Sequence, residues 1–399
     1  MLTVMVVTSN ARPKPTRPLQ QRMSATGATR ITCRCSRSCL LTTKPTRSPE
    51  PNMFSKIESS PMFPRLCCAL FVTALFSVAC QAQQTHQTQS LVPQEIQLDG
   101  KTYTLQFNDE FDGKEIDWDK WTYRGKGINP KRKRIFGTDG VKLDGKGNLI
   151  MTAYGVARQS LPDEYVDQFE GIWVPVTTNI RTKKEFTFGY HEVRLKMPIV
   201  KGFGMAVWLQ SNGQTQKNHP GTAEVGAEID VIEQTFFDRT GKPSDYKHST
   251  IHWGGYGKTH QFISITVDPQ TGTQEHTAHQ DEELNLVKTK VTKDRKGNDI
   301  PQNLVREKWT YKTDDLDFRD EQFHTVSVLW TPDYYKFYYD GHCIGKIEQG
   351  VSHAPGYMIL WPRMFNFLEL VGNTQEGPGD LQTSKAKYEV DYYRVYQAK

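Results

Sequence analysis

Three carboxylic acids lie within six residues of an apolar stretch, at a spacing that could support nucleophilic and acid/base chemistry. The stretch AEVGAEIDVIEQTF, residues 223–236, carries Glu228, Asp230 and Glu233 among Ile and Val side chains. A carboxylate in an apolar strand costs free energy unless it is paired, hydrogen-bonded or used in a reaction. We therefore interpret these three acids as candidate functional residues.

The spacing of the acids predicts an irregular strand. In a regular strand, side chains at i, i+2 and i+4 share a face, and the side chain at i+5 points to the other face. Glu228 and Asp230 would share a face that Glu233 would not. One extra residue, a β-bulge at residues 231–232, would return Glu233 to that face. We expect all three acids to line one groove, while Ile229 and one bulge residue enter the core.

This arrangement would suit glycoside hydrolysis. The outer Cα atoms would be about 13 Å apart at about 3.3 Å per residue, and inclined side chains could bring the Glu228 and Glu233 carboxylates to about 5–5.5 Å. That separation is typical of retaining enzymes, and about 6.5–9.5 Å is typical of inverting ones. Asp230 could hydrogen-bond the nucleophile, whose charge would raise the pKa of the other Glu. The alternative is a solvated strand face with incidental acids, because the bare motif E-x-D-x-x-E also occurs by chance.

The segments around the acids resemble glycoside hydrolase family 16, a family of β-jelly-roll endo-glycanases. EIDVIE resembles the longer, bulged form of its acid motif. Four further segments resemble family segments in the right order: LQFNDEFDGKEIDWDKWTY (105–123), IRTKKEFTFGYHEVRLKMP (180–198), VLWTPDYYKFYYDG (328–341) and YEVDYYRVYQ (388–397). The resemblance implies that Glu228 is the nucleophile, Asp230 the assisting carboxylate and Glu233 the general acid/base. It also implies an open cleft on the concave face, which suits endo-acting cleavage.

Other residues are candidates for substrate or metal binding. Trp208 and Trp253 flank the acids in sequence, and we expect their flat rings to be sugar platforms, the alternative being that each is a core residue. His252 could contact the substrate or the acids, or be structural, and Arg181 is a further groove candidate. Many family members bind a structural Ca²⁺ through an Asp in the last strand, a position that Asp391 matches. The resemblance implies no cofactor for catalysis.

The rest of the chain predicts an all-β domain over residues 93–399. Short β-branched and aromatic runs alternate with Gly, Asp-Gly and Pro turns, which indicates a sandwich or barrel. The resemblance narrows this to a jelly-roll sandwich of two antiparallel sheets with a concave substrate cleft. Residues 259–320 are charged and weakly periodic, so we expect them to be in part an insertion or a long loop pair.

The N-terminal part predicts export. Residues 66–79 form an apolar run between basic and polar flanks, so residues 53–80 are interpreted as a signal peptide, followed by a short linker at 81–92. Residues 1–52 are expected to be a non-native or disordered leader. Cys80 follows a sequence that resembles a lipobox. We expect a secreted or cell-surface protein, attached to a membrane only if Cys80 is lipidated, and a monomer.

The charge distribution argues against a nucleic-acid partner. Residues 1–80 hold 11 Lys/Arg against 2 Asp/Glu, and residues 81–399 hold 39 against 43. The basic excess therefore belongs to the leader, and the expected partner of the domain is a polysaccharide.

The sequence leaves two candidate classes of polysaccharide substrate. HWGG at 252–255 resembles β-1,3- and mixed-linkage-glucan-cleaving relatives, although GMAVW at 204–208 lacks part of their WPAFW-like segment. The Lys and Arg residues of 283–308 could instead face a sulfated galactan of the agar, porphyran or carrageenan type. β-Glucan is the first expectation and red-algal galactan the second. Transglycosylation and non-catalytic carbohydrate binding are the alternatives of another class.

Overall fold

The computed structural model describes residues 92–268, 286–313 and 316–399. They all lie in one compact unit, His86–Lys399, while the other unit, Met1–Thr85, lies outside the described residues. The expected leader, the signal peptide, Cys80 and nearly all of the 81–92 linker are therefore outside the described part of the chain. Among the described helices, none is long and apolar enough to cross a bilayer.

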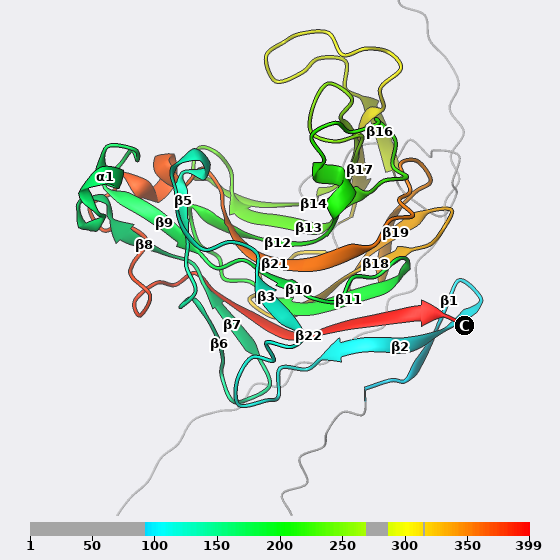
Figure 1. Cartoon of the computed structure of the whole chain (residues 1–399), viewed down its shortest axis with the longest axis horizontal. Coiled ribbons are helices and arrows are strands. Elements are labelled where there is room, and N and C mark those ends of the chain that lie inside the picture. Colours follow the sequence, from blue (N-terminus) through cyan, green and yellow to red (C-terminus); the bar gives the residue numbers. More distant parts are fainter. Residues whose placement is uncertain (1–91, 269–285, 314–315) are drawn as a thin grey trace, which may run out of the picture. The chain divides into compact units, whose positions relative to one another are not determined.

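Two nine-stranded sheets make up most of the fold, and they lie one above the other in Figure 1. In the first sheet, β6 pairs with β7, β7 pairs with β22, and the main order is β1-β2-β22-β11-β18-β19-β20. The bounds of its strands are β1 (Glu95–Leu98), β2 (Lys101–Asp109), β6 (Val141–Leu143), β7 (Leu149–Thr152), β11 (Gly189–Lys196), β18 (Phe323–Trp330), β19 (Tyr335–Tyr339), β20 (His342–Ile347) and β22 (Lys387–Ala398).

The second sheet carries the three acids on its central strand. Its order is β16-β17-β15-β14-β13-β12-β21-β10-β3. The bounds of its strands are β3 (Trp121–Tyr123), β10 (Ile180–Thr182), β12 (Phe203–Ser211), β13 (Ala227–Phe237), β14 (Pro243–Trp253), β15 (Gln261–Asp268), β16 (Leu286–Lys290), β17 (Arg306–Lys312) and β21 (Gly356–Met364).

A small third sheet, not expected from the sequence, has the order β4-β5-β9-β8. Its strands are β4 (Gly127–Asn129), β5 (Arg134–Phe136), β8 (Tyr154–Ala157) and β9 (Trp173–Thr177). Helical structure is limited to short turns: η1 (Pro130–Arg132), η2 (Arg158–Ser160), α1 (Asp163–Val166), η3 (Asn212–Thr215) and the π-turn η5 (Leu368–Gly372).

The hydrophobic core lies between the two large sheets. Val193 and Leu195 of β11 are buried, whereas Arg194 between them is not, as period-two alternation requires. Val207 and Leu209 of β12 belong to the same apolar cluster from the opposite sheet. Because each sheet buries one face against the other, the outer face of the acid-bearing sheet is left for the groove. The all-β jelly-roll sandwich predicted from the sequence is thus confirmed.

Residues 259–320 were expected to be in part an insertion or a long loop pair. Their described parts contain three strands instead: β15, β16 and β17. β15 pairs antiparallel with β14, β17 pairs parallel with β15, and β16 forms the edge of the sheet. Ile263, Ile265 and Trp309 are buried on the core face. The weak periodicity has a physical cause, since strands near a sheet edge carry many charged side chains on the solvent face. The β15–β17 pair is also the one parallel contact in a large sheet otherwise antiparallel in its described strands.

Candidate active site

Strand β13 contains the bulge that the sequence predicts. On one side, β12 pairs with Asp230 and then with Ile232, so Val231 has no partner there. On the other side, β13 advances three residues from Asp230 to Glu233 while β14 advances two. One extra residue therefore lies between Asp230 and Glu233, which confirms the bulge.

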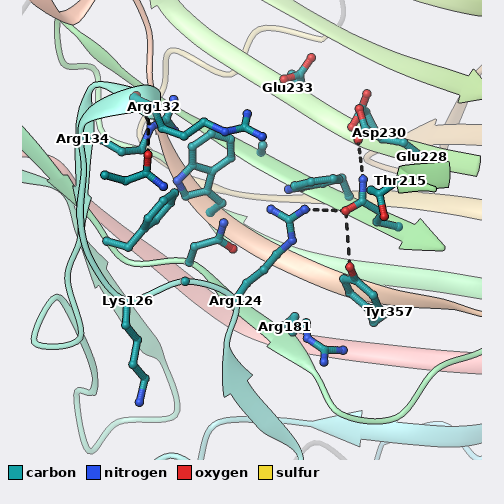
Figure 2. Close-up of a pocket in the computed structure, with 18 of the residues that line it drawn as sticks. Arg124, Lys126, Arg132, Arg134, Arg181, Thr215, Glu228, Asp230, Glu233 and Tyr357 are labelled. Atoms are coloured by element: carbon teal, nitrogen blue, oxygen red, sulfur yellow. Dashed lines mark hydrogen bonds between the residues drawn. The ribbon is translucent and has the colours of Figure 1, made fainter. Parts of the chain in front are cut away.

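The bulge brings all three acids into the lining of one groove with a volume of about 860 Å³ (Figure 2). Asp230 is buried at the base, while Glu228 and Glu233 are half-buried. Both bulge residues, rather than one, lie in the core. The apolar side chains that enter the core between the acids are Ile229, Val231 and Ile232.

Two neutral donors hold the Glu228 carboxylate. Gln210 on β12 donates from Nε2 to Glu228 Oε2 at 3.0 Å, and the Tyr256 hydroxyl donates to the same oxygen. Gln210 Nε2 is also 2.7 Å from the Tyr256 hydroxyl oxygen, so the three groups form one network. These hydrogen bonds fix the orientation of the carboxylate and leave its second oxygen for another partner.

Asp230 contacts His252, which in turn contacts a second histidine. His252 Nε2 lies 3.3 Å from Asp230 Oδ2 and 3.9 Å from Glu228 Oε1. The other ring nitrogen, Nδ1, lies 2.9 Å from Nε2 of His260 on the loop before β15. Burial lowers the pKa of His252 and lowers that of His260 to about 4, so both imidazoles are neutral near pH 7. A neutral His252 can donate one N–H to the acids and accept one from His260.

The pKa values of the two neighbouring acids are both raised. Burial, followed by the negative charge of Asp230, raises the pKa of Glu228 to about 7. Burial raises the pKa of Asp230 to about 7. Because one carboxylate makes ionisation of the other less favourable, the pair keeps a proton into the neutral range.

This shift predicts that the Glu228→Gln variant gains stability relative to wild type as the pH rises. The folded state binds the Glu228 proton more tightly than the unfolded state, so wild-type stability is lost as pH rises from about 4.5 to about 7. The slope is at most about 1.4 kcal/mol per pH unit. Thermal unfolding across this pH window measures the effect.

The matched control for this measurement is Glu224→Gln, which changes an exposed Glu outside the groove lining. The difference in Tm between Glu228→Gln and wild type should increase by several degrees from pH 4.5 to pH 7, whereas Glu224→Gln should show no trend. A flat difference for both variants would contradict the raised pKa.

Glu233 has different neighbours. His248 Nε2 lies 2.7 Å from Glu233 Oε2, and Arg363 on β21 forms an ion pair with Glu233 Oε1. Burial lowers the pKa of His248 to about 4, so this imidazole is neutral. A neutral imidazole can donate to a carboxylate or accept from a carboxylic acid, so this contact suits both protonation states of Glu233. Arg363 favours the ionised state alone.

The structure places Trp208 and Arg181 in the groove lining. The Trp208 indole is only 7% exposed, and the Arg124 guanidinium lies 4.6 Å from its ring centroid. The Arg181 guanidinium lies 4.3 Å from the ring centroid of Tyr357. Both residues lie in the groove lining, and their role in substrate binding stays a prediction.

His252 and Trp253 point to opposite faces of β14. His252 is paired with Glu228 and contacts Asp230, which is one of the roles that the sequence left open, and its contact with substrate stays a prediction. Trp253 is 5% exposed and belongs to the core cluster, opposite the buried Ala227. The prediction that Trp253 binds substrate is wrong, because adjacent strand residues alternate in direction and His252 occupies the groove face.

Asp391 lies on the first sheet, where it forms an ion pair with Arg194. Among the described residues, three ligand-type side chains lie within 4.8 Å of one another at Glu228, Asp230 and His252, in the groove. Asp391 is not part of this group. Calcium binding at Asp391 stays a prediction.

Several site residues were missed by the sequence reasoning. Gln210 lies two residues after Trp208 on β12, so strand alternation could have found it. Tyr256 is close in sequence to His252, but its contact depends on the loop after β14. His248 could have been found by counting back along β14 from His252. Arg363 carried no local signal.

The segment that contains the acids matches a known family. Residues 172–280 match the model of glycosyl hydrolases family 16. The match includes Glu228, Asp230 and Glu233 and is typical of a glycoside hydrolase. It confirms the resemblance that the motifs predict. No curated protein matches the chain.

Solved structures with similar folds include glycan-cleaving proteins. The endo-β-1,3-glucanase from Pyrococcus furiosus is 23% identical, with a TM-score of 0.48 over 77% of this chain and 99% of that one. An endo-acting O-glycanase structure from human gut microbiota is 21% identical, with a TM-score of 0.47 over 76% and 93%. The laminarinase catalytic domain of Thermotoga maritima MSB8 is 20% identical, with a TM-score of 0.46 over 74% and 99%.

Proposed function

We propose that this chain, whose residues 172–280 match glycosyl hydrolases family 16, is an exported, retaining endo-β-glycanase. The observation that carries the proposal is the arrangement of the acids around the β13 bulge. Glu228 and Glu233 line the same groove but have different surroundings, with neutral donors at the first and a histidine and an arginine at the second. Two carboxyl groups with different environments can take the two roles of a double displacement.

In the first step, an ionised Glu228 attacks the anomeric carbon of the bound sugar. Gln210 and Tyr256 hold its Oε2, so Oε1 is the oxygen that forms the new bond. Glu233 donates its proton to the glycosidic oxygen as the bond from that oxygen to the anomeric carbon breaks. The products are a shortened chain with a free hydroxyl group and a glycosyl ester on Glu228.

In the second step, Glu233 acts as the base. It removes a proton from water, whose oxygen attacks the anomeric carbon and releases Glu228 as a carboxylate. Two inversions give net retention. Asp230 and His252 lie beside Glu228 throughout and can take up or release a proton as its charge changes. This chemistry requires no cofactor.

The ion pair between Arg363 and Glu233 has a place in this scheme. Because Arg363 favours the ionised carboxylate, the guanidinium must leave Oε1 before Glu233 can donate a proton. A sugar chain in the groove could take over this contact with its hydroxyl groups. The neutral His248 remains a partner for either form of Glu233.

The remaining parts of the proposal rest on the sequence. The expected signal peptide supports secretion or cell-surface attachment, with a membrane contact only if Cys80 is lipidated. β-1,3 or mixed-linkage glucan remains one candidate substrate. Trp253 can no longer support it, because this residue lies in the core. A red-algal galactan is the second candidate, favoured by the five cationic side chains in the groove lining.

The test is hydrolysis of laminarin, mixed-linkage glucan, agarose, porphyran and carrageenan by the full chain. We expect new reducing ends, a rapid fall in viscosity as internal bonds break, and fresh products in the β configuration by proton NMR. Products of α configuration would exclude the retaining mechanism. No new reducing ends on any of these substrates would count against hydrolysis and favour binding or transfer to a sugar acceptor.

A further inference from the structure

One side of the groove is cationic. Its lining includes five basic side chains, and the lining acids are the three of β13. These basic residues are Arg124, Lys126, Arg132, Arg134 and Arg181. The domain as a whole carries no basic excess, since residues 81–399 hold 39 Lys/Arg against 43 Asp/Glu. The positive charge is therefore local to the groove.

The cations come from the chain segment between β3 and β5, together with β10. Arg132 ends the turn η1, Arg134 begins β5, and Arg124 lies between β3 and β4. In Figure 2, Arg132 and Arg134 lie across the groove from the three acids, Arg124 extends from between β3 and β4 toward Glu228, and the Lys126 ammonium extends away from the acids. The three arginines therefore form a wall that faces the reacting centre.

These cations form no ion pairs with carboxylates among the described residues, although the charge of Arg124 acts on Glu228. None of the five forms an ion pair with a described carboxylate. Their hydrogen bonds are with neutral groups: Arg124 donates to the Gln210 amide oxygen, and Arg134 Nε donates to the Arg132 carbonyl oxygen at 3.0 Å. Most guanidinium hydrogen-bond donors on this wall are thus available to a ligand.

Arg134 is the most constrained member of the wall. It is partly buried, and its guanidinium lies 4.7 Å from the ring centroid of Trp361. Burial and the like charges of Arg132 and Arg363 lower its pKa to about 10. Arg132 and Arg134 repel each other, and neither forms an ion pair with a described carboxylate. This repulsion costs free energy that a bound anion would recover.

A neutral polysaccharide gives no reason for this charge. Hydroxyl groups are recognised by neutral polar side chains and aromatic rings, which the groove also contains in Gln210, Tyr256 and Tyr357. Sulfate and carboxylate groups are planar or tetrahedral anions that pair with guanidinium groups through two parallel hydrogen bonds. The wall consists of arginines, which can make such paired hydrogen bonds, whereas lysines cannot.

We infer that the groove binds an acidic polysaccharide, whose sulfate ester or carboxylate groups contact Arg132 and Arg134 on the β5 side. This inference rests on the proposed function only in placing a sugar chain in the groove. Sulfated and carboxylated chains share one feature, an anionic substituent on the sugar. This substituent must lie within reach of the wall when a glycosidic bond lies between Glu228 and Glu233. Arg124 and Arg181 are further donors along the same chain.

The first test measures binding without turnover. The Glu228→Gln variant of the full chain is titrated with agarose oligosaccharides and porphyran oligosaccharides, which differ in sulfation. A second set compares laminarin, sulfated laminarin and carboxymethyl laminarin. We expect the anionic member of at least one set to bind at least about tenfold more tightly, since hydrogen bonds to charged groups are worth this much or more. The sulfated and carboxymethyl arms identify which anion is preferred.

The second test locates the preference. Arg132→Ala and Arg134→Gln should each lower the ratio of anionic-ligand affinity to neutral-ligand affinity by about tenfold. Binding of the neutral ligand should change little. Arg239→Ala is the matched control, because Arg239 is an exposed arginine in the β13–β14 turn and outside the groove lining. Thermal unfolding checks the fold, and Arg132→Ala keeps the test interpretable if Arg134→Gln is unstable, since Arg132 is exposed.

The outcomes separate this inference from the proposed function. Equal binding of anionic and neutral ligands, or a preference that Arg132→Ala and Arg134→Gln leave intact, would overturn the inference even if the wild type hydrolyses a neutral glucan. An arginine-dependent preference without hydrolysis of any substrate would support the inference and count against the glycanase. A true preference should also weaken as ionic strength rises from about 0.01 M to about 1 M, because the screening length falls from about 30 Å to about 3 Å.

Discussion

Replacement of Glu228 by Gln should lower kcat on the polysaccharide by about a thousandfold or more, with little effect on KM. The amide cannot form the glycosyl ester, yet it keeps the size and one acceptor of the carboxyl group. Gln210 and Tyr256 retain a side chain to contact. Reducing-end release measures the loss, and Glu224→Gln in the loop before β13 should leave the rate unchanged. A Glu228→Gln variant with more than a few per cent of wild-type activity would exclude Glu228 as the nucleophile.

A second variant at the same position distinguishes a nucleophile from a residue that only supports the site. In Glu228→Ala, azide can enter the space that the carboxylate leaves and attack the anomeric carbon from the same side. Glu233 still protonates the leaving oxygen, so the product is an α-glycosyl azide. Rescue by azide with this configuration requires the Glu228 carboxylate to lie on that face of the sugar. A β-glycosyl azide would instead assign Glu228 to the opposite face and reverse the roles of the two Glu residues.

Replacement of Glu233 by Gln should lower kcat by about 10²–10⁴-fold on the polysaccharide, because general acid catalysis contributes this much. An aryl oligosaccharide has a leaving group that needs no protonation. For this substrate, the rate of the first step, formation of the glycosyl ester, should fall far less. The glycosyl ester should then accumulate, because no base activates water. A burst of aryl alcohol followed by slow turnover is the expected signature, and mass spectrometry should find the sugar on Glu228.

The environment of Glu233 provides the control for this second prediction. Azide added to Glu233→Ala should attack the accumulated ester from the face opposite Glu228 and give a β-glycosyl azide. His248→Gln keeps Glu233 and removes only its imidazole partner, so its effect on kcat should be smaller than that of Glu233→Gln. In Glu233→Gln, a burst rate on the aryl substrate that falls as far as kcat on the polysaccharide would contradict a proton-transfer role.

The acid cluster was predictable because its geometry is local. Glu228, Asp230 and Glu233 lie on one strand, and counting residues by period two is enough to require a bulge between the second and third acids. The same rule, applied to the next strand, would have prevented the error at Trp253. His252 and Trp253 are adjacent, so only one of them could face the groove.

The surroundings of the acids were not predictable in this way. Arg363 reaches Glu233 from β21, more than a hundred residues along the chain, and Tyr256 reaches Glu228 from a loop. The cationic wall depends on β4 and β5, which form a small third sheet through a parallel contact between β5 and β9. The contacts of Arg363 and Tyr256 and the pairing of β5 with β9 have no signature in the composition or spacing of a single segment.

The sequence by itself determined the all-β class, the three acids and the face of the strand on which they lie, because these follow from side-chain alternation within a few residues. Only the tertiary structure decided which partner each acid has, that Trp253 is a core residue, and that the groove is positively charged. Those features depend on which distant strands pair and in what register, and local periodicity carries no information about that choice. The sign of the groove in particular was hidden by a domain whose total charge is slightly negative.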